Sequence, residues 1–169
     1  MDDNLVSSIP LFEYIELYAD KNDLSKFIFG KIVSRNSFYI IISAVTPNGH
    51  YDGFVLKRIE DIIKICRNTK YKEKLLCKID ESKIKKFDNS KTENLIAELL
   101  SFAKDNNLIA SIEILESGYN EAIGLINEIC DNYVSIKHIA FNGEFDGITY
   151  LNTKDITQIS VDSEEERNW

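Results

Sequence analysis

The sequence predicts a mainly β protein with short helices, built from two tandem copies of one small β-barrel, each preceded by a helix. Three observations lead to this fold class. The turn at residues 48–53 (NGHYDG) returns at residues 142–147 (NGEFDG), short strand-like segments surround both turns, and a helix-like pattern precedes each group of strands. A chain of 169 residues with 44% hydrophobic residues is long enough for two such small domains.

An internal duplication is the first feature to establish, because missing a repeat misreads the whole fold. Residues 30–65 align without a gap on residues 124–159, and 11 of these 36 positions are identical. The identical positions are glycines, turn residues and large apolar residues, which are the types that a backbone constrains most strongly. This match indicates that both copies share one fold.

A helical pattern precedes each copy. The first helix is predicted from Leu11 onward (LFEYIELYADKND) and the second from Asn94 onward (NLIAELLSFAKDNN). In both segments the apolar residues recur at the three- and four-residue spacing of one helix face: Leu11, Tyr14, Ile15 and Tyr18 in the first, and Leu95, Leu99, Phe102 and Ala103 in the second. Ser90 or Thr92 could cap the second helix.

Short strands follow each predicted helix. The alternation of apolar and polar residues predicts strands at 27–34, 38–45, 51–57 and 61–66 in the first copy, and at 110–116, 122–129, 133–141, 145–151 and 155–161 in the second. The strand at 110–116 has no evident counterpart in the first copy. We expect residues 71–79 (YKEKLLCKI) or a neighbouring segment to take its place.

The repeated turns are predicted to be structural rather than catalytic. Asn-Gly between the two longest strands supplies the positive φ that a tight hairpin needs, and the Asp-Gly that follows is typical of a bulge early in the next strand. The residues assigned to these turns are Asn48, Gly49, Asp52 and Gly53 in the first copy and Asn142, Gly143, Asp146 and Gly147 in the second.

Three regions are expected along the chain. Residues 1–66 hold the first helix and barrel, residues 67–91 form a lysine-rich linker, and residues 92–169 hold the second helix, the second barrel and an acidic tail. The linker has one apolar segment, Leu75, Leu76 and Ile79, that should dock on a core. An alternative is a single fused unit in which exposed edge strands of the two copies pair with each other.

The order of a helix and five short bent strands resembles the Sm-like fold, a small SH3-like β-barrel. The segments SIEILESG, AIGLINEICDNYVSI and DGITYLNTKDITQI carry the resemblance, which covers about two-thirds of the chain. It implies two Sm-like barrels and, as an alternative function, binding of single-stranded RNA. The matching contact positions are Arg35 and Asn36 in the first copy and Asp131 and Asn132 in the second. The later turns, 57–60 and 151–154, lack the basic residue and glycine that the family commonly has there.

Few residues suggest catalysis or metal binding. The two histidines, His50 and His138, do not occupy equivalent repeat positions, and the three cysteines have no metal-binding spacing. The repeated carboxylates, Asp52, Asp146, Asp61 and Asp155, are the only metal candidates, and each fits a turn. We therefore expect no enzyme activity, no cofactor and no metal.

Composition favours a cytoplasmic protein-binding role. The net charge of −8 and the pI near 4.8 disfavour nucleic acid as a partner and favour a basic protein. The N-terminus lacks a signal-peptide pattern, no apolar run is long enough for a membrane, and an odd number of cysteines indicates a reducing compartment. The abundance of lysine over arginine suggests an AT-rich bacterial genome.

The leading hypothesis is a non-catalytic bacterial protein that binds another protein, with an inhibitor or immunity protein of a basic toxin as its specific version. A homo-oligomer is compatible with it. Alternatives are RNA binding, and a small ligand or enzyme site in the groove between the repeats.

Overall fold

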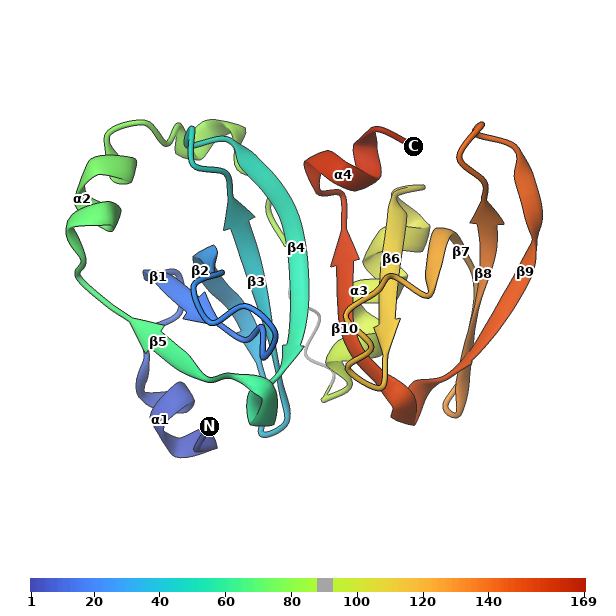
Figure 1. Ribbon diagram of the computed structural model, residues 1–169, viewed down its shortest axis with the longest axis horizontal. Helices are drawn as coiled ribbons and strands as arrows, with labels where there is room; N and C mark the ends of the chain where they lie inside the picture. Colours follow the sequence, from blue (N-terminus) through green and yellow to red (C-terminus); the bar gives the residue numbers. More distant parts are fainter. Residues whose placement is uncertain (88–92) are drawn as a thin grey trace. The chain divides into compact units, whose positions relative to one another are not determined.

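The computed structural model describes residues 1–87 and 93–169, which belong to two compact units, Met1–Asn89 and Ser90–Trp169. Figure 1 shows the elements of both units. Ser90 and Thr92, the predicted helix caps, lie outside the described residues. The helix that follows is capped by Asn94, whose side-chain oxygen accepts a hydrogen bond from Ala97 N at 3.1 Å.

The first unit contains five antiparallel strands in the order β5-β1-β2-β3-β4. Its elements in chain order are α1 (Asp3–Ser8), β1 (Tyr14–Tyr18), β2 (Ile28–Arg35), β3 (Tyr39–Val45), β4 (Tyr51–Arg58), η1 (Ile59–Asp61), β5 (Lys64–Cys66), α2 (Lys70–Leu76) and η2 (Glu81–Lys83).

The second unit also contains five antiparallel strands, in the order β10-β6-β7-β8-β9. Its elements are α3 (Leu95–Asp105), β6 (Ile109–Ile114), β7 (Ala122–Ile129), β8 (Tyr133–Ile139), β9 (Phe145–Asn152), η3 (Thr153–Asp155), β10 (Ile156–Val161) and α4 (Glu164–Arg167).

The prediction of two small Sm-like or SH3-like barrels is wrong. The ten strands form open antiparallel sheet structure, and within each unit the first and last strands of the order do not pair with each other among the described residues. Hairpin turns determine which neighbouring strands pair, and those signals were readable in the sequence. Closure depends on strand tilt and shear, which a pattern of apolar residues does not report.

The predicted helix from Leu11 is also wrong, because its centre forms strand β1. Tyr14, Ile15, Glu16 and Leu17 are all buried there, so the segment is covered on both faces of the sheet. A short run that is apolar on both faces places residues at spacings that also fit one face of a helix. β1 is the missing counterpart of β6, since both precede the first long hairpin of their unit.

The two units repeat the same strand registers at the shift of 94. Ile32 lies opposite Ile42 in the first unit, and Ile126 lies opposite Ile136 in the second. The register also shifts at matching places. The shift between β2 and β3 corresponds to the one between β7 and β8, and the shift between β3 and β4 corresponds to the one between β8 and β9. The duplicated residues therefore produce duplicated bulges, which bend the strands locally.

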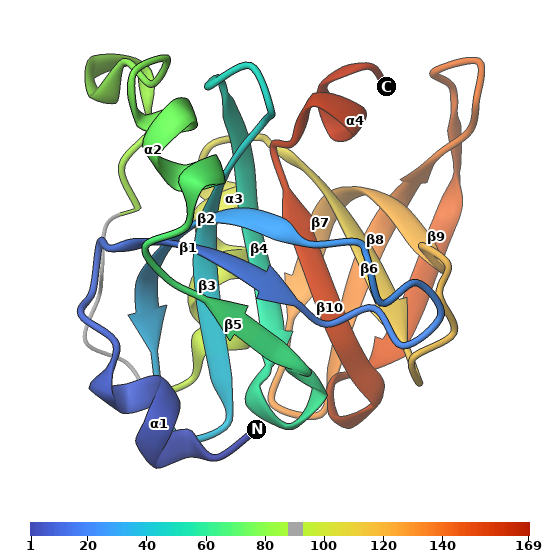
Figure 2. The ribbon, with the colours of Figure 1, turned by 60° about the vertical axis from the view of Figure 1, so that its left-hand side comes forward.

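Apolar clusters support both faces of the first sheet. One cluster contains Val6, Ile15, Leu17, Ile32, Ile40, Ile42 and Ile59. The other joins Tyr14, Phe29 and Val45 to Leu75 of α2, which lies beside β1 (Figure 2). In the segment predicted to dock, Leu75 is buried and Ile79 packs against this cluster, whereas Leu76 is 43% exposed.

In the second unit the buried apolar residues come from α3 and from the inward side of the strands. They include Leu99, Leu100, Ala110, Ile112, Ile126, Val134, Ile136 and Ile159. In the part of the chain that is described, no helix is long and apolar enough to cross a membrane; α3, with 11 residues, is the longest.

Candidate binding surface

The repeated turns occupy matching hairpin ends. In the first unit Gly49 has a φ of +85°, Thr46 N donates to His50 O and Gly49 N donates to Thr46 O. In the second unit Gly143 has a φ of +78°, and the same two bonds join Ala140 to Glu144 and Gly143 to Ala140. Asn48 and Asn142 precede these glycines. Both asparagines are therefore part of the turn that closes the hairpin.

The Asp-Gly pairs lie at the bulges of the next strands. The register shifts between Ser43 and Val45 opposite β4, where Gly53 has a φ of +79°, and between Lys137 and Ile139 opposite β9, where Gly147 has a φ of +82°. Asp52 and Asp146 directly precede these two glycines. The pairs therefore lie where each hairpin bends.

The residues assigned to an RNA contact have mainly local partners. Arg35 donates through Nη1 to the carbonyl oxygens of Val6, at 2.9 Å, and Ile9, which anchors α1. Asn36 accepts hydrogen bonds from Phe38 N and Tyr39 N, both at 2.8 Å. Asp131 and Asn132 are exposed at the turn between β7 and β8.

The remaining sequence candidates are dispersed. Asp61 ends η1 and accepts two bonds from Arg58, whereas Asp155 ends η3 and accepts one from Asn152, so both carboxylates stabilise the same turn of the repeat. Among the described residues, no three His, Cys, Asp or Glu side chains gather as a metal site. Cys66, Cys77 and Cys130 are free thiols.

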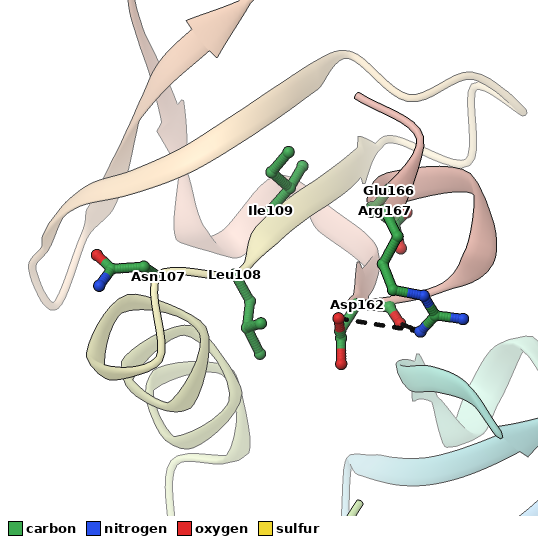
Figure 3. Close-up of a pocket in the computed structure, with 6 residues that line it drawn as sticks. All are labelled: Asn107, Leu108, Ile109, Asp162, Glu166 and Arg167. Atoms are coloured by element: carbon green, nitrogen blue, oxygen red, sulfur yellow. Dashed lines mark hydrogen bonds and ion pairs between the residues drawn. The ribbon is translucent and has the colours of Figure 1, made fainter.

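A shallow pocket of about 160 Å³ lies in the second unit, beside α4. It is lined by Asn107, Leu108, Ile109, Asp162, Glu166 and Arg167 (Figure 3). Glu166 is only 2% exposed, and its two carboxylate oxygens accept from Ser111 Oγ at 2.7 Å and from Ser163 N at 2.8 Å. Arg167 donates to the backbone oxygen of Asp162 and forms an ion pair with its carboxylate.

Glu166, Arg167 and Asp162 of this pocket are therefore engaged in contacts of α4. Ser163 and Glu166 form a capping box, in which each satisfies a backbone N–H of the other. Glu166 is 2% exposed, so a ligand in the pocket has little access to its carboxylate. The pocket explains how α4 is held against β6, and it does not identify a substrate.

The strand β9 provides a different kind of surface. It is the last strand in the order of its unit, with β8 on one side and no paired strand on the other side among the described residues (Figure 1). Four large apolar residues of β9 and its hairpin are exposed, and we call them the β9 surface: Phe141 (95%), Phe145 (63%), Ile148 (43%) and Tyr150 (63%). Exposed large apolar residues along the free edge of a sheet are a candidate interaction site.

The neighbours of β9 extend this surface. The ring of Tyr150 lies 6.0 Å from that of Tyr133 on β8, and the ring of Phe141 lies 4.7 Å from that of Trp169. Tyr133 Oη donates to Glu128 Oε2 at 3.1 Å. Hydrogen bonding to Cys130 and Glu128 raises the pKa of Tyr133 above its ordinary value.

The equivalent positions of the first unit are buried. Phe54, Val55 and Leu56 of β4 correspond to Ile148, Thr149 and Tyr150 of β9 at the shift of 94, and they are 0%, 7% and 0% exposed. Within its unit, the ring of Phe54 contacts the rings of Tyr51 and Phe87. Large apolar residues therefore occupy these positions in both copies. They are buried in the first copy, whereas Ile148 and Tyr150 of the second copy are exposed to solvent.

The acidic charge of the chain is concentrated in the second unit. Residues 90–169 contain 5 Lys and Arg against 15 Asp and Glu, whereas residues 1–89 contain 15 against 13, so the formal charges are −10 and +2. Acidic residues lie toward both ends of β9: Glu144 and Asp146 at its start, and Asp131 and Asp155 near its end. Lys137, opposite Ile148, and Lys154 are the basic residues nearby.

No protein-family model, curated protein or solved structure matches the chain. The residues themselves therefore carry the functional inference.

The sequence predicts a strand at 145–151, close to the observed β9, but does not predict that β9 is exposed. The alternation in FDGITYL is equally typical of a strand covered on one face. The signal that could have found the surface is the difference in charge between the two copies, since every acidic residue counted above is visible in the sequence.

Proposed function

We propose that the chain is a non-catalytic cytoplasmic protein that binds a basic protein partner through the β9 surface of its second unit. The carrying observation is an edge strand, β9, that pairs only with β8 among the described residues. It and its hairpin hold four exposed apolar residues, and acidic residues lie near both of its ends. Apolar anchors supply most of the binding energy of an interface, and surrounding charges select the partner.

Three further observations support the proposal. In the described pocket, the carboxylate of Glu166 is engaged by Ser111 and Ser163 beside α4. Arg35, the basic residue among the RNA candidates, anchors α1. The three free cysteines fit a reducing compartment. An inhibitor or immunity protein of a basic toxin is the specific version of this role, because such a protein needs a complementary acidic surface and no catalytic groups.

A matched pair of charge variants tests the proposal. Glu144 and His50 occupy equivalent exposed positions of the two hairpins, so Glu144→Lys changes the acidic surface and His50→Lys is its control in the first unit. The full chain and both variants are immobilised and used to capture proteins from the native host, which are identified by mass spectrometry.

We expect a basic partner that is retained by the wild type and by His50→Lys and is depleted by Glu144→Lys. A new lysine at this site replaces attraction by repulsion and should weaken binding by about tenfold, equivalent to about 1.4 kcal/mol. Equal recovery on all three proteins, or an acidic partner, would contradict the proposal.

A further inference from the structure

On the outer edge of β9, the register identifies backbone groups that have no partner strand among the described residues. Thr153 N donates to Asn132 O at 3.0 Å, so residues 132 and 153 form a hydrogen-bonded pair of the antiparallel ladder. Such pairs alternate with non-bonded pairs along the register, which joins Tyr133 to Asn152 and Ser135 to Tyr150. The N–H and C=O groups of Ile148, Tyr150 and Asn152 therefore point away from β8.

We propose that β9 binds its partner by strand addition: an extended segment of the partner pairs with the outward backbone groups of Ile148, Tyr150 and Asn152. This inference rests on the proposed function and specifies its geometry. An unpaired edge is a ready template for another strand, and proteins usually block such an edge with lysine, proline or a covering segment. β9 contains neither lysine nor proline.

The chemistry of the incoming segment follows from the chemistry along β9. The middle of the strand presents Ile148 and Tyr150, while Glu144 and Asp146 lie toward one end and Asp131 and Asp155 toward the other. The complementary segment is a strand with β-branched residues in its centre and lysine or arginine at both ends. Main-chain hydrogen bonds then supply affinity and the side chains supply specificity.

A second copy of the chain does not fit this description. Pairing β9 with β9 of another copy would bring together two units that each carry a formal charge of −10. Like charges facing each other across an interface are unfavourable. The occupant is therefore a basic segment of a different protein.

The test uses the octapeptide Lys-Lys-Val-Thr-Val-Thr-Lys-Lys, whose length equals the 8 residues of β9. Two further versions carry N-methyl groups on one or the other alternating set of central backbone nitrogens. Only one set faces β9 in an added strand, so one methylated peptide should bind like the parent and the other about tenfold more weakly or less. Binding is measured by titration calorimetry with the full-length protein.

Two variants of Tyr150 examine the protein side. Tyr150→Pro removes an outward N–H and leaves the ladder with β8 intact, which is the position that tolerates proline in an edge strand. Tyr150→Ala removes the same side chain but keeps the N–H. We expect Tyr150→Pro to bind the parent peptide about tenfold more weakly than Tyr150→Ala. In amide NMR spectra, the peptide should slow exchange at Ile148, Tyr150 and Asn152.

The outcomes separate the two proposals. Failure of the parent peptide to bind, or equal binding of both methylated peptides, overturns strand addition, and so does equal binding by the two Tyr150 variants. The proposed function would still stand if the captured partner is lost with Glu144→Lys. If light scattering shows a wild-type dimer that Tyr150→Pro dissociates, the edge belongs to a second copy, and strand addition by a basic partner is wrong.

Discussion

Individual glycines of the repeat are required for two distinct reasons. A Cβ atom on Gly124 would lie 2.0 Å from Lys137 O, and one on Gly30 would lie 2.3 Å from Ser43 O. Both glycines therefore permit a close approach of backbone at the same place in the two sheets. Gly147 has open space around it and is needed only for its φ of +82°. Identity between the copies thus reflects packing at one position and backbone conformation at another.

The two kinds of glycine should differ in their cost on substitution. Gly124→Ala forces the backbone of β8 to move and should lower the free energy of unfolding by about 3 kcal/mol. Gly147→Ala adds only the strain of a positive φ, about 1 kcal/mol. Both residues lie in the second unit, so urea unfolding of the full chain compares them directly. Equal costs would show that the close contact at Gly124 relaxes freely.

At the scale of elements, η2 is attached to the first sheet by one carboxylate. Glu81 accepts hydrogen bonds from Tyr14 Oη at 2.6 Å and from Lys31 Nζ at 2.7 Å. The bond from Lys31, followed by the bond from Tyr14, holds the pKa of Glu81 below its ordinary value of 4.5. The segment after α2 is thereby fixed to β1 and β2.

This attachment predicts a pH dependence of stability. Because the folded pKa is lowered, the contribution of Glu81 is fully present above pH 4.5 and is lost as the pH falls through the lowered value. Glu81→Gln should reduce stability at pH 7 and flatten the loss on acidification, measured as urea midpoints between neutral and acidic pH. The carboxylate is half exposed, so the effect is small. Glu73→Gln, at an exposed position of α2, is the control, and an identical pH profile for the two variants would refute the attachment.

The elements also show what the sequence could and could not predict. Strand β7 matches its predicted range, and the other hairpin strands lie within a few residues of theirs, because turn glycines and apolar alternation are local signals. The sequence around β1 predicts a helix, because burial on both faces removes the alternation that identifies a strand. Openness of the sheets and exposure of Ile148 and Tyr150 depend on contacts between distant segments, which no local pattern reports.

At the scale of the whole molecule, the net charge and the strand β9 have separate roles in binding the partner. The −10 of the second unit acts over a distance comparable to the Debye length, whereas the backbone groups of β9 act only in contact. Charge should therefore determine mainly the association rate constant of the partner, and contacts with β9 should determine mainly its dissociation rate constant.

Binding kinetics test this division. Raising the salt concentration should slow association with the basic octapeptide or with the captured partner, and should change dissociation little. Tyr150→Ala should speed dissociation and change association little, since it removes a contact and leaves the charge unchanged. Surface plasmon resonance at several salt concentrations measures both rates. A salt effect confined to dissociation would show that charge acts only within the bound complex.

The open edge of β9 also has a cost for a protein that is kept without its partner. The carboxylates that attract a basic segment also keep identical edges apart. As the pH falls toward the ordinary pKa values of Asp and Glu that repulsion weakens, while Phe145, Ile148 and Tyr150 stay exposed. An uncovered strand of this composition then becomes a template for aggregation. The acidity of the chain thus serves as protection during the time that β9 is empty.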